Sequence, residues 1–317
     1  MTAVIEWRAI APVLLVLIAA VLGILVEAVV PVVHRFFAQV FLTIASIVVA
    51  AAFVVANWRA GIGGPVVMGS MMLDGPTYFS WAALLVFGLA AILVFAEREV
   101  NGGVSTFAAS AATVPGSRAE AEASAARLEH TEVFPLALFA LGGMMVFPAA
   151  SDLITMFVAL EVFSLPLYLM CGMARRRRLL SQEAALKYFL LGAFSSAFFL
   201  FGVALLYGYA GSFDLSAIAT AVQNPTMGRG ILIAGMALVG VGLLFKVSVV
   251  PFHNWTPDVY MGAPTPVTGF MAICTKLAAV GATMRVFYVA LGGERWNWQP
   301  LLAVLVVATM VVGAVWA

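Results

Sequence analysis

Charged residues are scarce in this chain of 317 residues: they make up 10% of it, against 64% hydrophobic residues and a mean hydropathy of +1.08. That leaves too little polar surface to cover a soluble domain of this size. The net charge is only +1, and no basic run with interleaved aromatic residues occurs, which argues against a nucleic-acid partner. The composition therefore predicts an all-α, polytopic membrane protein.

Cysteines and cofactor motifs are also nearly absent. The chain has two cysteines, Cys171 and Cys274, both in apolar runs. We expect them to be small packing residues rather than a disulfide or a metal pair. No CxxC, HExxH, GxGxxG or P-loop pattern is present. The expectation is that this chain holds no metal and no redox or nucleotide cofactor of its own.

Lysine is much rarer than arginine. The three lysines, Lys187, Lys246 and Lys276, all lie in hydrophobic segments, whereas the thirteen arginines lie mostly in loops or at segment ends. A charge near the bilayer centre costs about 2.5–3.5 kcal/mol, so it normally faces a protein interior or a water-filled cavity. Arginine stays charged, whereas a lysine held away from water can release its proton. The lysines are therefore candidates for proton handling.

Long hydrophobic runs are the main feature that is present. A membrane-spanning helix needs about 20 mostly apolar residues. On that basis nine segments are predicted, over residues 9–30, 37–57, 77–96, 134–151, 153–173, 183–209, 230–260, 266–291 and 299–317.

The seventh segment is too long for one straight crossing. It contains Pro251 and a polar cluster formed by His253, Asn254, Thr256 and Asp258. We expect a broken helix, which a membrane tolerates only where the freed backbone is buried in protein or lines water. The break would lie between two of the lysines.

Four consecutive arginines, 175–178, predict that the loop after the fifth segment is cytoplasmic. Counting back places the N-terminus outside, and the run over 9–26 is interpreted as the first membrane helix rather than a signal peptide. The connection 97–133 is interpreted as a cytoplasmic spacer, with an exposed helix within 117–131; a contact surface for a partner is the alternative. The chain ends at Ala317 inside an apolar run, so we expect a longer protein.

Glu161 and Lys246 are expected to be deep in the membrane. Glu161 lies roughly 12 Å along its helix from Asp152, at 1.5 Å per residue. It is interpreted as the proton-relay partner of a lysine, or as a neutral glutamic acid that bridges two helices. Lys246 follows a long apolar run directly before the break, where snorkelling to the surface is difficult.

Three further groups are candidates for the relay. Lys187 has Glu183 four residues before it, so an ion pair on the helix surface is the structural alternative to a relay role. Histidine is the side-chain type that suits proton exchange near physiological pH, so His253 is interpreted as a relay between lysines, or as a brace for the frayed backbone. Lys276 lies ten residues into its helix, again near mid-membrane, and Arg285 further along is expected to be an interfacial anchor.

Three stretches of the sequence resemble a known family. They read ALEVFSLPLYL, EAALKYFLLGAFSSAFFLFG and FKVSVVPFHNWTPDVYMGAPTPVTGF. They are similar to the antiporter-like membrane subunits of respiratory complex I and to their relatives in multi-subunit cation/proton antiporters. The wording TPDVYMGAPTPVT looks like the subunit N branch of NADH:quinone oxidoreductase. The resemblance covers about 133–285.

The resemblance implies an antiporter-like fold of about fourteen helices with two inverted five-helix repeats, each containing a broken helix. Here that would give three N-terminal helices in 1–96, the connection 97–133, the first repeat in 134–291, and the start of the second in 292–317. Two departures are a connection that looks longer than usual and the absence of the second repeat.

By the family's pattern, Glu161 pairs with Lys246, and Lys187 lies nearby. Lys276 would carry protons toward the molecule's centre, with His253 on the path between the lysines. NADH, FMN, iron–sulfur clusters and quinone would belong to other subunits of a hetero-oligomer in a bacterial inner membrane. The implied function is proton translocation coupled to quinone reduction; the alternatives are a subunit of a cation/proton antiporter and a scaffold that moves no protons.

Overall fold

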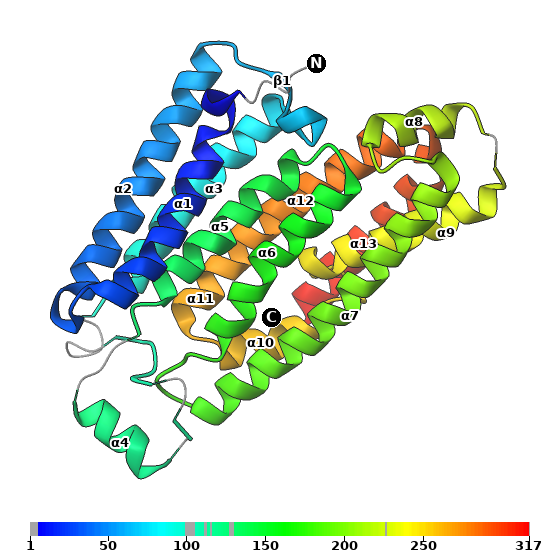
Figure 1. Cartoon of the computed structure of the whole chain (residues 1–317). Helices are drawn as coiled ribbons and strands as arrows, with labels where there is room; N and C mark the ends of the chain where they lie inside the picture. Colours follow the sequence, from blue (N-terminus) through cyan, green and yellow to red (C-terminus); the bar gives the residue numbers. More distant parts are fainter. Residues whose placement is uncertain are drawn as a thin grey trace.

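The computed structural model describes residues 6–98, 105–110, 113–114, 116–126, 130–225 and 227–316. Long helices run alongside one another as a single bundle (Figure 1). They are α1 (Trp7–Val29), α2 (Val32–Arg59), α3 (Gly75–Phe95), α5 (Val133–Ala149), α6 (Leu153–Cys171), α7 (Arg178–Ala210), α9 (Arg229–Val247), the helical stretch 265–290, and α13 (Arg295–Trp316).

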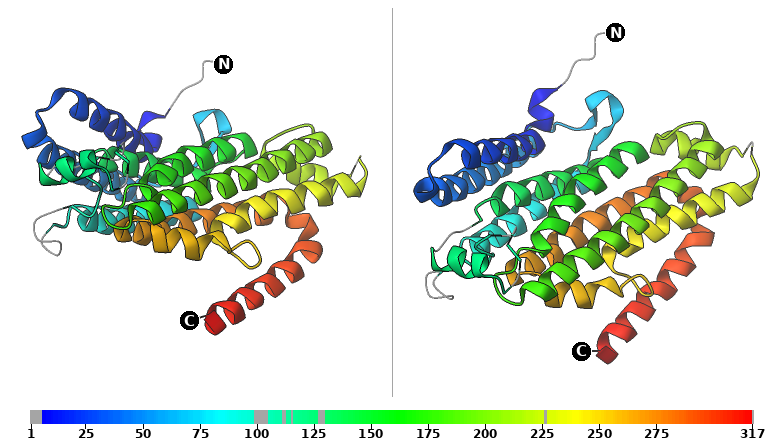
Figure 2. Two further views of the ribbon diagram at one scale, coloured as in Figure 1. Left: turned by 90° about the horizontal axis from the view of Figure 1, so that it is seen from below. Right: turned by 60° about the horizontal axis from the view of Figure 1, so that its bottom comes forward.

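The fold is all-α and polytopic, as predicted. Within the described residues, eight helices are long and apolar enough to cross a membrane, and α5 is a shorter apolar helix of 17 residues. Because α5 contacts α1, α3, α6 and α12 (Lys276–Arg285), nearly all of its side chains are buried. α13 leans away from the other helices and stays largely exposed (Figure 2).

The seventh predicted segment is broken in the structure. α9 ends at Val247 and α10 (Trp255–Gly262) begins only at Trp255. Ser248 ends α9 in the left-handed backbone conformation, with φ +66°. The eighth segment, predicted as one regular helix, differs from that expectation. It joins α11 (Thr265–Phe270) to α12 (Lys276–Arg285) through a π-helical turn over Met271–Thr275, and a second π-helical turn follows over Val286–Ala290.

Several short elements were not predicted, or only partly. A two-stranded antiparallel hairpin pairs β1 (Gly64–Val66) with β2 (Met71–Leu73), so that Gly64 lies opposite Leu73. α8 (Leu215–Gln223) follows α7, between the predicted segments 183–209 and 230–260, where no helix was predicted. α4 (Arg118–Ala125) lies within the stretch predicted as an exposed helix, although residues 127–129 of that stretch lie outside the described part.

Aspartates fix where three of the helices begin. The side chains of Asp74, Asp152 and Asp214 accept hydrogen bonds from backbone N–H groups in the first turns of α3, α6 and α8. The Asp74 contact to Thr77 N is 2.9 Å long, and the Asp152 contact to Thr155 N is 2.7 Å long. These N-caps satisfy donors that would otherwise lack partners at the helix starts.

Arg285, which the sequence predicts to be an interfacial anchor, joins α12 to α3. Its side chain is buried; it donates to Asp74 Oδ1 at 2.8 Å, to Thr77 Oγ1 at 2.8 Å and to the carbonyl of Pro148 at 2.6 Å. Burial acts to raise the pKa of Asp74, but the hydrogen bonds from Arg285 and Thr77 and the charge of Arg285 outweigh it, so the pKa is lowered.

Glycine lets α7 and α9 approach closely. A Cβ atom built on Gly202 would lie 2.6 Å from Val239 N and 2.8 Å from the carbonyl of Gly235. Both are backbone atoms, which cannot swing aside as a flexible side chain would. Small residues at such crossings are a common device for packing helices in membranes.

We expect Gly202→Ala to destabilise the protein by about 1–3 kcal/mol, because the added methyl group overpacks the α7–α9 contact. Gly230→Ala is the matched control: it also lies in α9, and its Cβ would meet nothing within 4 Å. Gly230→Ala should leave the stability unchanged or raise it, since alanine favours a helix more than glycine does. Thermal unfolding in detergent measures both; equal effects would contradict the packing argument.

We expect Asp74→Asn to lower the stability at pH 7 by about 1 kcal/mol, a modest figure because water screens this half-exposed carboxylate. Asparagine keeps the N-cap but removes the ion pair with Arg285. A lowered folded-state pKa stabilises above the unfolded pKa of about 3.9, and that contribution is lost as the pH falls through the folded value. The loss of stability in Asp74→Asn, relative to the unsubstituted protein, should therefore be largest at neutral pH and should shrink at acid pH, as the pH falls through the lowered folded-state pKa.

Asp152→Asn is the control for this measurement, because Asp152 is also an N-cap and no ion pair to it is found within the described residues. Its substitution should change the stability little at either pH. A pH-independent loss for Asp74→Asn would contradict the assignment of the effect to the ion pair with Arg285.

Candidate functional site

Where α9 ends, backbone carbonyl groups of its last turn accept hydrogen bonds from neighbouring side chains, in addition to the backbone bond that Phe245 accepts from Ser248 N. The indole Nε1 of Trp255 donates to the carbonyl of Phe245 at 3.1 Å, and Lys276 Nζ donates to the carbonyl of Lys246 at 3.5 Å. On the far side of the break, Val250 N donates to Thr309 Oγ1 at 3.0 Å. The freed backbone is therefore satisfied inside the protein, as a membrane environment requires.

Lys246 is a fully buried amine, with 1% of the residue exposed. Its Nζ donates to Ser164 Oγ at 2.8 Å and lies 3.5 Å from the hydroxyl of Tyr168. The rings of Phe163, Tyr168 and Tyr188 lie 5.4–5.5 Å from the nitrogen, within the range of cation–π attraction. Hydroxyl groups and ring faces thus replace the water that the ammonium group loses.

Glu161 lies on the same face of α6 as these partners. Ser164 and Tyr168 follow it by three and seven residues, the spacing of one helical face. Glu161 interacts electrostatically with Lys246, but no direct ion pair joins the two within the described part of the chain. The carboxylate Oε1 is buried and has no hydrogen-bond partner there. The Ser164 hydroxyl is the group that contacts the lysine directly.

Lys276 reaches the same break from the other side. It begins α12, directly after the π-helical turn Met271–Thr275. Its Nζ donates to Ser248 Oγ, and that oxygen also accepts from Thr256 Oγ1 at 2.8 Å. The ring of Trp255 lies 5.2 Å from the nitrogen. The two lysines are therefore linked through the backbone of Lys246 and the adjoining turn.

Lys187 occupies a different environment. Its Nζ forms ion pairs with Glu183 at 2.7 Å and with Asp258 at 2.6 Å, and 41% of its side chain is exposed. The first contact is the i,i+4 pair considered from the sequence, and the second ties α7 to α10. The structure does not bring this amine into hydrogen-bond contact with Lys246 or Lys276 in the described residues.

His253 lies in the non-helical segment between α9 and α10. Its ring is 5.2 Å from the ring of Trp316 in α13. Both ring nitrogens are buried and lack a hydrogen-bond partner among the described residues. Direct bonding to either lysine is therefore not observed, and its relay role stays a prediction.

Five contributors to the site were not predicted as site residues: Ser164, Tyr168, Ser248, Trp255 and Thr256, the last of which was named only as a member of the polar cluster at the break. The signal for two of them was available, because Ser164 and Tyr168 follow Glu161 at helical spacing. Of the other three, Ser248 lies in the break, and Trp255 and Thr256 begin α10 directly after it, where the periodicity of the preceding helix no longer gives the direction of a side chain. Among the described residues, no cluster of His, Cys, Asp or Glu suited to a metal ion is found.

Comparisons with a family model and with individual proteins point to the same family. A family model described as NADH:quinone oxidoreductase/Mrp antiporter, TM matches residues 150–317, more than half of the chain. NADH-quinone oxidoreductase subunit N from Nocardioides sp. (strain ATCC BAA-499 / JS614) is 55% identical over 318 residues, covering 98% of this chain and 60% of the relative. The subunit N of Rhodococcus opacus (strain B4) is 54% identical, covering 99% of this chain and 61% of the relative.

Solved structures share the fold. A chain of respiratory complex I from Thermus thermophilus matches with a TM-score of 0.72 and 32% identity, covering 95% of this chain and 57% of that one. A chain of the Mrp complex from Dietzia sp. DQ12-45-1b also has a TM-score of 0.72, at 23% identity, over 96% of this chain and 54% of that one, which shows likeness of fold alone. The chain spans about three fifths of the length of the curated relatives it matches.

We expect Ser164→Ala to destabilise the protein by about 1–3 kcal/mol, because it leaves the buried amine of Lys246 without its nearest acceptor. Ser195→Ala is a matched control, since this serine is also buried in a helix and its hydroxyl has no partner in the described residues. Its loss should be close to neutral. Unfolding curves in detergent compare the two; a neutral Ser164→Ala would argue against the contact.

Proposed function

The chain belongs to the NADH:quinone oxidoreductase/Mrp antiporter family of membrane proteins, and on that premise we propose that it is part of a proton-translocating subunit, of the subunit N type, of a bacterial NADH:quinone oxidoreductase. One observation carries the proposal. Two lysine amines meet at an interrupted membrane helix, and one of them is fully buried beside a carboxylate-bearing helix face. A protein that only needed to pack its helices would gain nothing from burying such a charge.

Lys246 is the central carrier in this proposal. The Glu161 carboxylate attracts a proton held on Lys246, whereas a proton arriving at Lys276 repels it. The charge on Lys246 therefore depends on its distance from both neighbours. Any movement of the α9 break changes those distances, and an opposite charge at about 4–6 Å strongly favours the charged form of its partner. Ser164 and Ser248 would hold the amines in place and offer hydroxyl groups for proton transfer.

Lys187 and His253 would serve the path on either side of this centre. Lys187 is half-exposed and bonded to Asp258, so it is suited to exchange protons with water near the start of α7. His253 lies on the segment that joins the two halves of the broken helix, and its unbonded ring nitrogens suit a transient proton acceptor.

The wider setting is proposed from the relatives' names and from the sequence. Redox chemistry with NADH, FMN, iron–sulfur clusters and quinone would take place in other subunits of a hetero-oligomer, and its energy would move the α9 break. The assembly would lie in the bacterial inner membrane, with the 175–178 loop cytoplasmic and the N-terminus outside. Residues 134–291 would form the first five-helix repeat, preceded by three helices in 1–96 and the connection 97–133, and followed in 292–317 by the start of the second repeat.

We expect Lys246→Ala to reduce the rate of proton pumping by the assembly at least about tenfold. A positioned proton-transfer group typically contributes more than this to a rate, so the figure is a lower bound. Lys246→Arg should fail in the same way, because arginine keeps the charge but does not release a proton. Lys187→Ala, at the exposed end, should cost less. The measurement is acidification of inverted membrane vesicles driven by NADH, with assembly checked by NADH oxidation with an artificial acceptor.

The alternatives predict different results. A scaffold that moves no protons would leave pumping intact in Lys246→Ala. A cation/proton antiporter would give a purified assembly that contains no flavin and does not oxidise NADH. Rescue of pumping by Lys246→Arg would show that the charge alone matters.

A further inference from the structure

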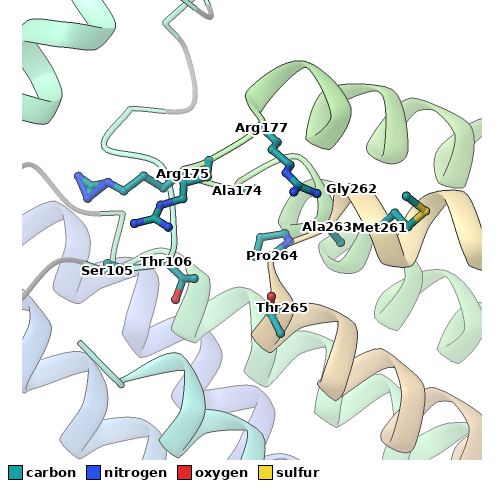
Figure 3. Close-up of a pocket in the computed structure, with 11 residues that line it drawn as sticks. Ser105, Thr106, Ala174, Arg175, Arg177, Met261, Gly262, Ala263, Pro264 and Thr265 are labelled. Carbon is teal, nitrogen blue, oxygen red and sulfur yellow. The ribbon is translucent and has the colours of Figure 1, made fainter. Parts of the chain in front are cut away.

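A cavity of about 580 Å³ lies away from the lysines, at the ends of α6, α7 and α10 (Figure 3). Three segments line it: 105–106, 174–177 and 261–265. Figure 3 shows Arg177 reaching from the start of α7 toward the Gly262–Pro264 turn, with Thr106 and Thr265 across the cavity. The volume is within the range of small-ligand sites.

Arginine is the only charged residue type in the described lining of this cavity. Arg175, Arg176 and Arg177 all line it, and no acidic residue does so among the described residues. The next residue behaves differently: Arg178 is buried and forms an ion pair with Glu120 at 3.2 Å. Arg176 and Arg177, in contrast, are exposed and have no ion pair within the part of the chain that the structure describes.

The walls of the cavity are held by backbone contacts rather than by loose loops. Arg175 N donates to the carbonyl of Thr106 at 2.9 Å, which fixes two lining segments against each other. On the opposite wall, a Cβ atom built on Gly262 would lie 2.5 Å from the carbonyl of Leu180, so α10 packs tightly on α7. The guanidinium groups therefore project from a preformed frame.

We propose that this cavity binds a phosphate group. Arginine binds phosphate through paired, charge-assisted hydrogen bonds, and the threonine hydroxyls lining the cavity add neutral donors. Basic pockets at the ends of membrane helices suit the headgroups of anionic lipids. α6 ends at Cys171, only four residues before Arg175, so the cavity opens close to the end of a membrane helix.

Apolar surface beside the cavity favours a lipid as the source of the phosphate. Met261 lines the cavity and is 70% exposed, and Leu179, two residues beyond Arg177, is 72% exposed. Acyl chains attached to a bound headgroup would cover these side chains. The site uses none of the residues of the proton path, so it does not depend on that proposal.

The test uses the intact membrane protein in lipid nanodiscs of phosphatidylcholine, with or without phosphatidylglycerol, and counts retained lipids by native mass spectrometry. We expect the unsubstituted protein to retain phosphatidylglycerol. In Arg177→Gln the affinity for this lipid should fall about tenfold, which corresponds to the loss of one charge-assisted hydrogen bond. Arg177→Lys keeps the positive charge but not the paired N–H donors of the guanidinium group, so it should lose less of the bound phosphatidylglycerol than Arg177→Gln does. Arg59→Gln, an exposed arginine at the end of α2, is the control for loss of one positive charge.

A second arm asks whether free phosphate is the ligand. Inorganic phosphate, in lipid-depleted protein, should slow the modification of Arg177 by phenylglyoxal if it occupies the cavity. Protection by phosphatidylglycerol vesicles identifies a lipid site, and protection by inorganic phosphate alone identifies a site for the free anion. Equal lipid retention in Arg177→Gln and Arg59→Gln, with no protection by either probe, would overturn the proposal.

Discussion

The burial of a single amine governs much of this structure. Moving an ammonium group out of water costs several kcal/mol even after the protein relaxes, and Lys246 is almost wholly enclosed. The hydroxyl of Ser164, three aromatic rings and a carboxylate-bearing face of α6 gather around it. The interrupted α9 provides the other half of the arrangement, since its freed carbonyl groups accept the hydrogen bonds of Trp255 and Lys276.

The surrounding bundle keeps these parts in register. α7 and α9 meet at glycine contacts that bring their backbones close, so the end of α9 is held at a fixed depth. α12 carries Lys276 at one end and Arg285 at the other, and the bonds of Arg285 to Asp74 and to the carbonyl of Pro148 tie that helix to α3 and α5. The polar groups of the centre are thus positioned by contacts at a distance from it.

The sequence was sufficient for the helices and for the break. Each apolar run near the length of a bilayer became a helix, and Pro251 with its polar neighbours marked the interruption between Lys246 and Lys276. The sequence did not show which helices lie next to one another. Spacing places Ser164 on the same face of α6 as Glu161, but it does not show which helices touch, so the contact of Ser164 with Lys246 and the pairing of Lys187 with Asp258 could not be predicted. The β-hairpin and α8 were missed because they depend on short turns and caps rather than on hydrophobic runs.

The π-helical turn before Lys276 has a genetic consequence. Such a turn contains one residue more than the regular helix would need, and the surplus residue rotates everything that follows by about one hundred degrees. Removing one codon between 271 and 275 would leave a regular α-helix from Thr265 to the second π-helical turn, which begins at Val286. The deletion would also turn the amine of Lys276 away from Ser248. The more regular helix would therefore lose the contact that holds this lysine at the break after α9.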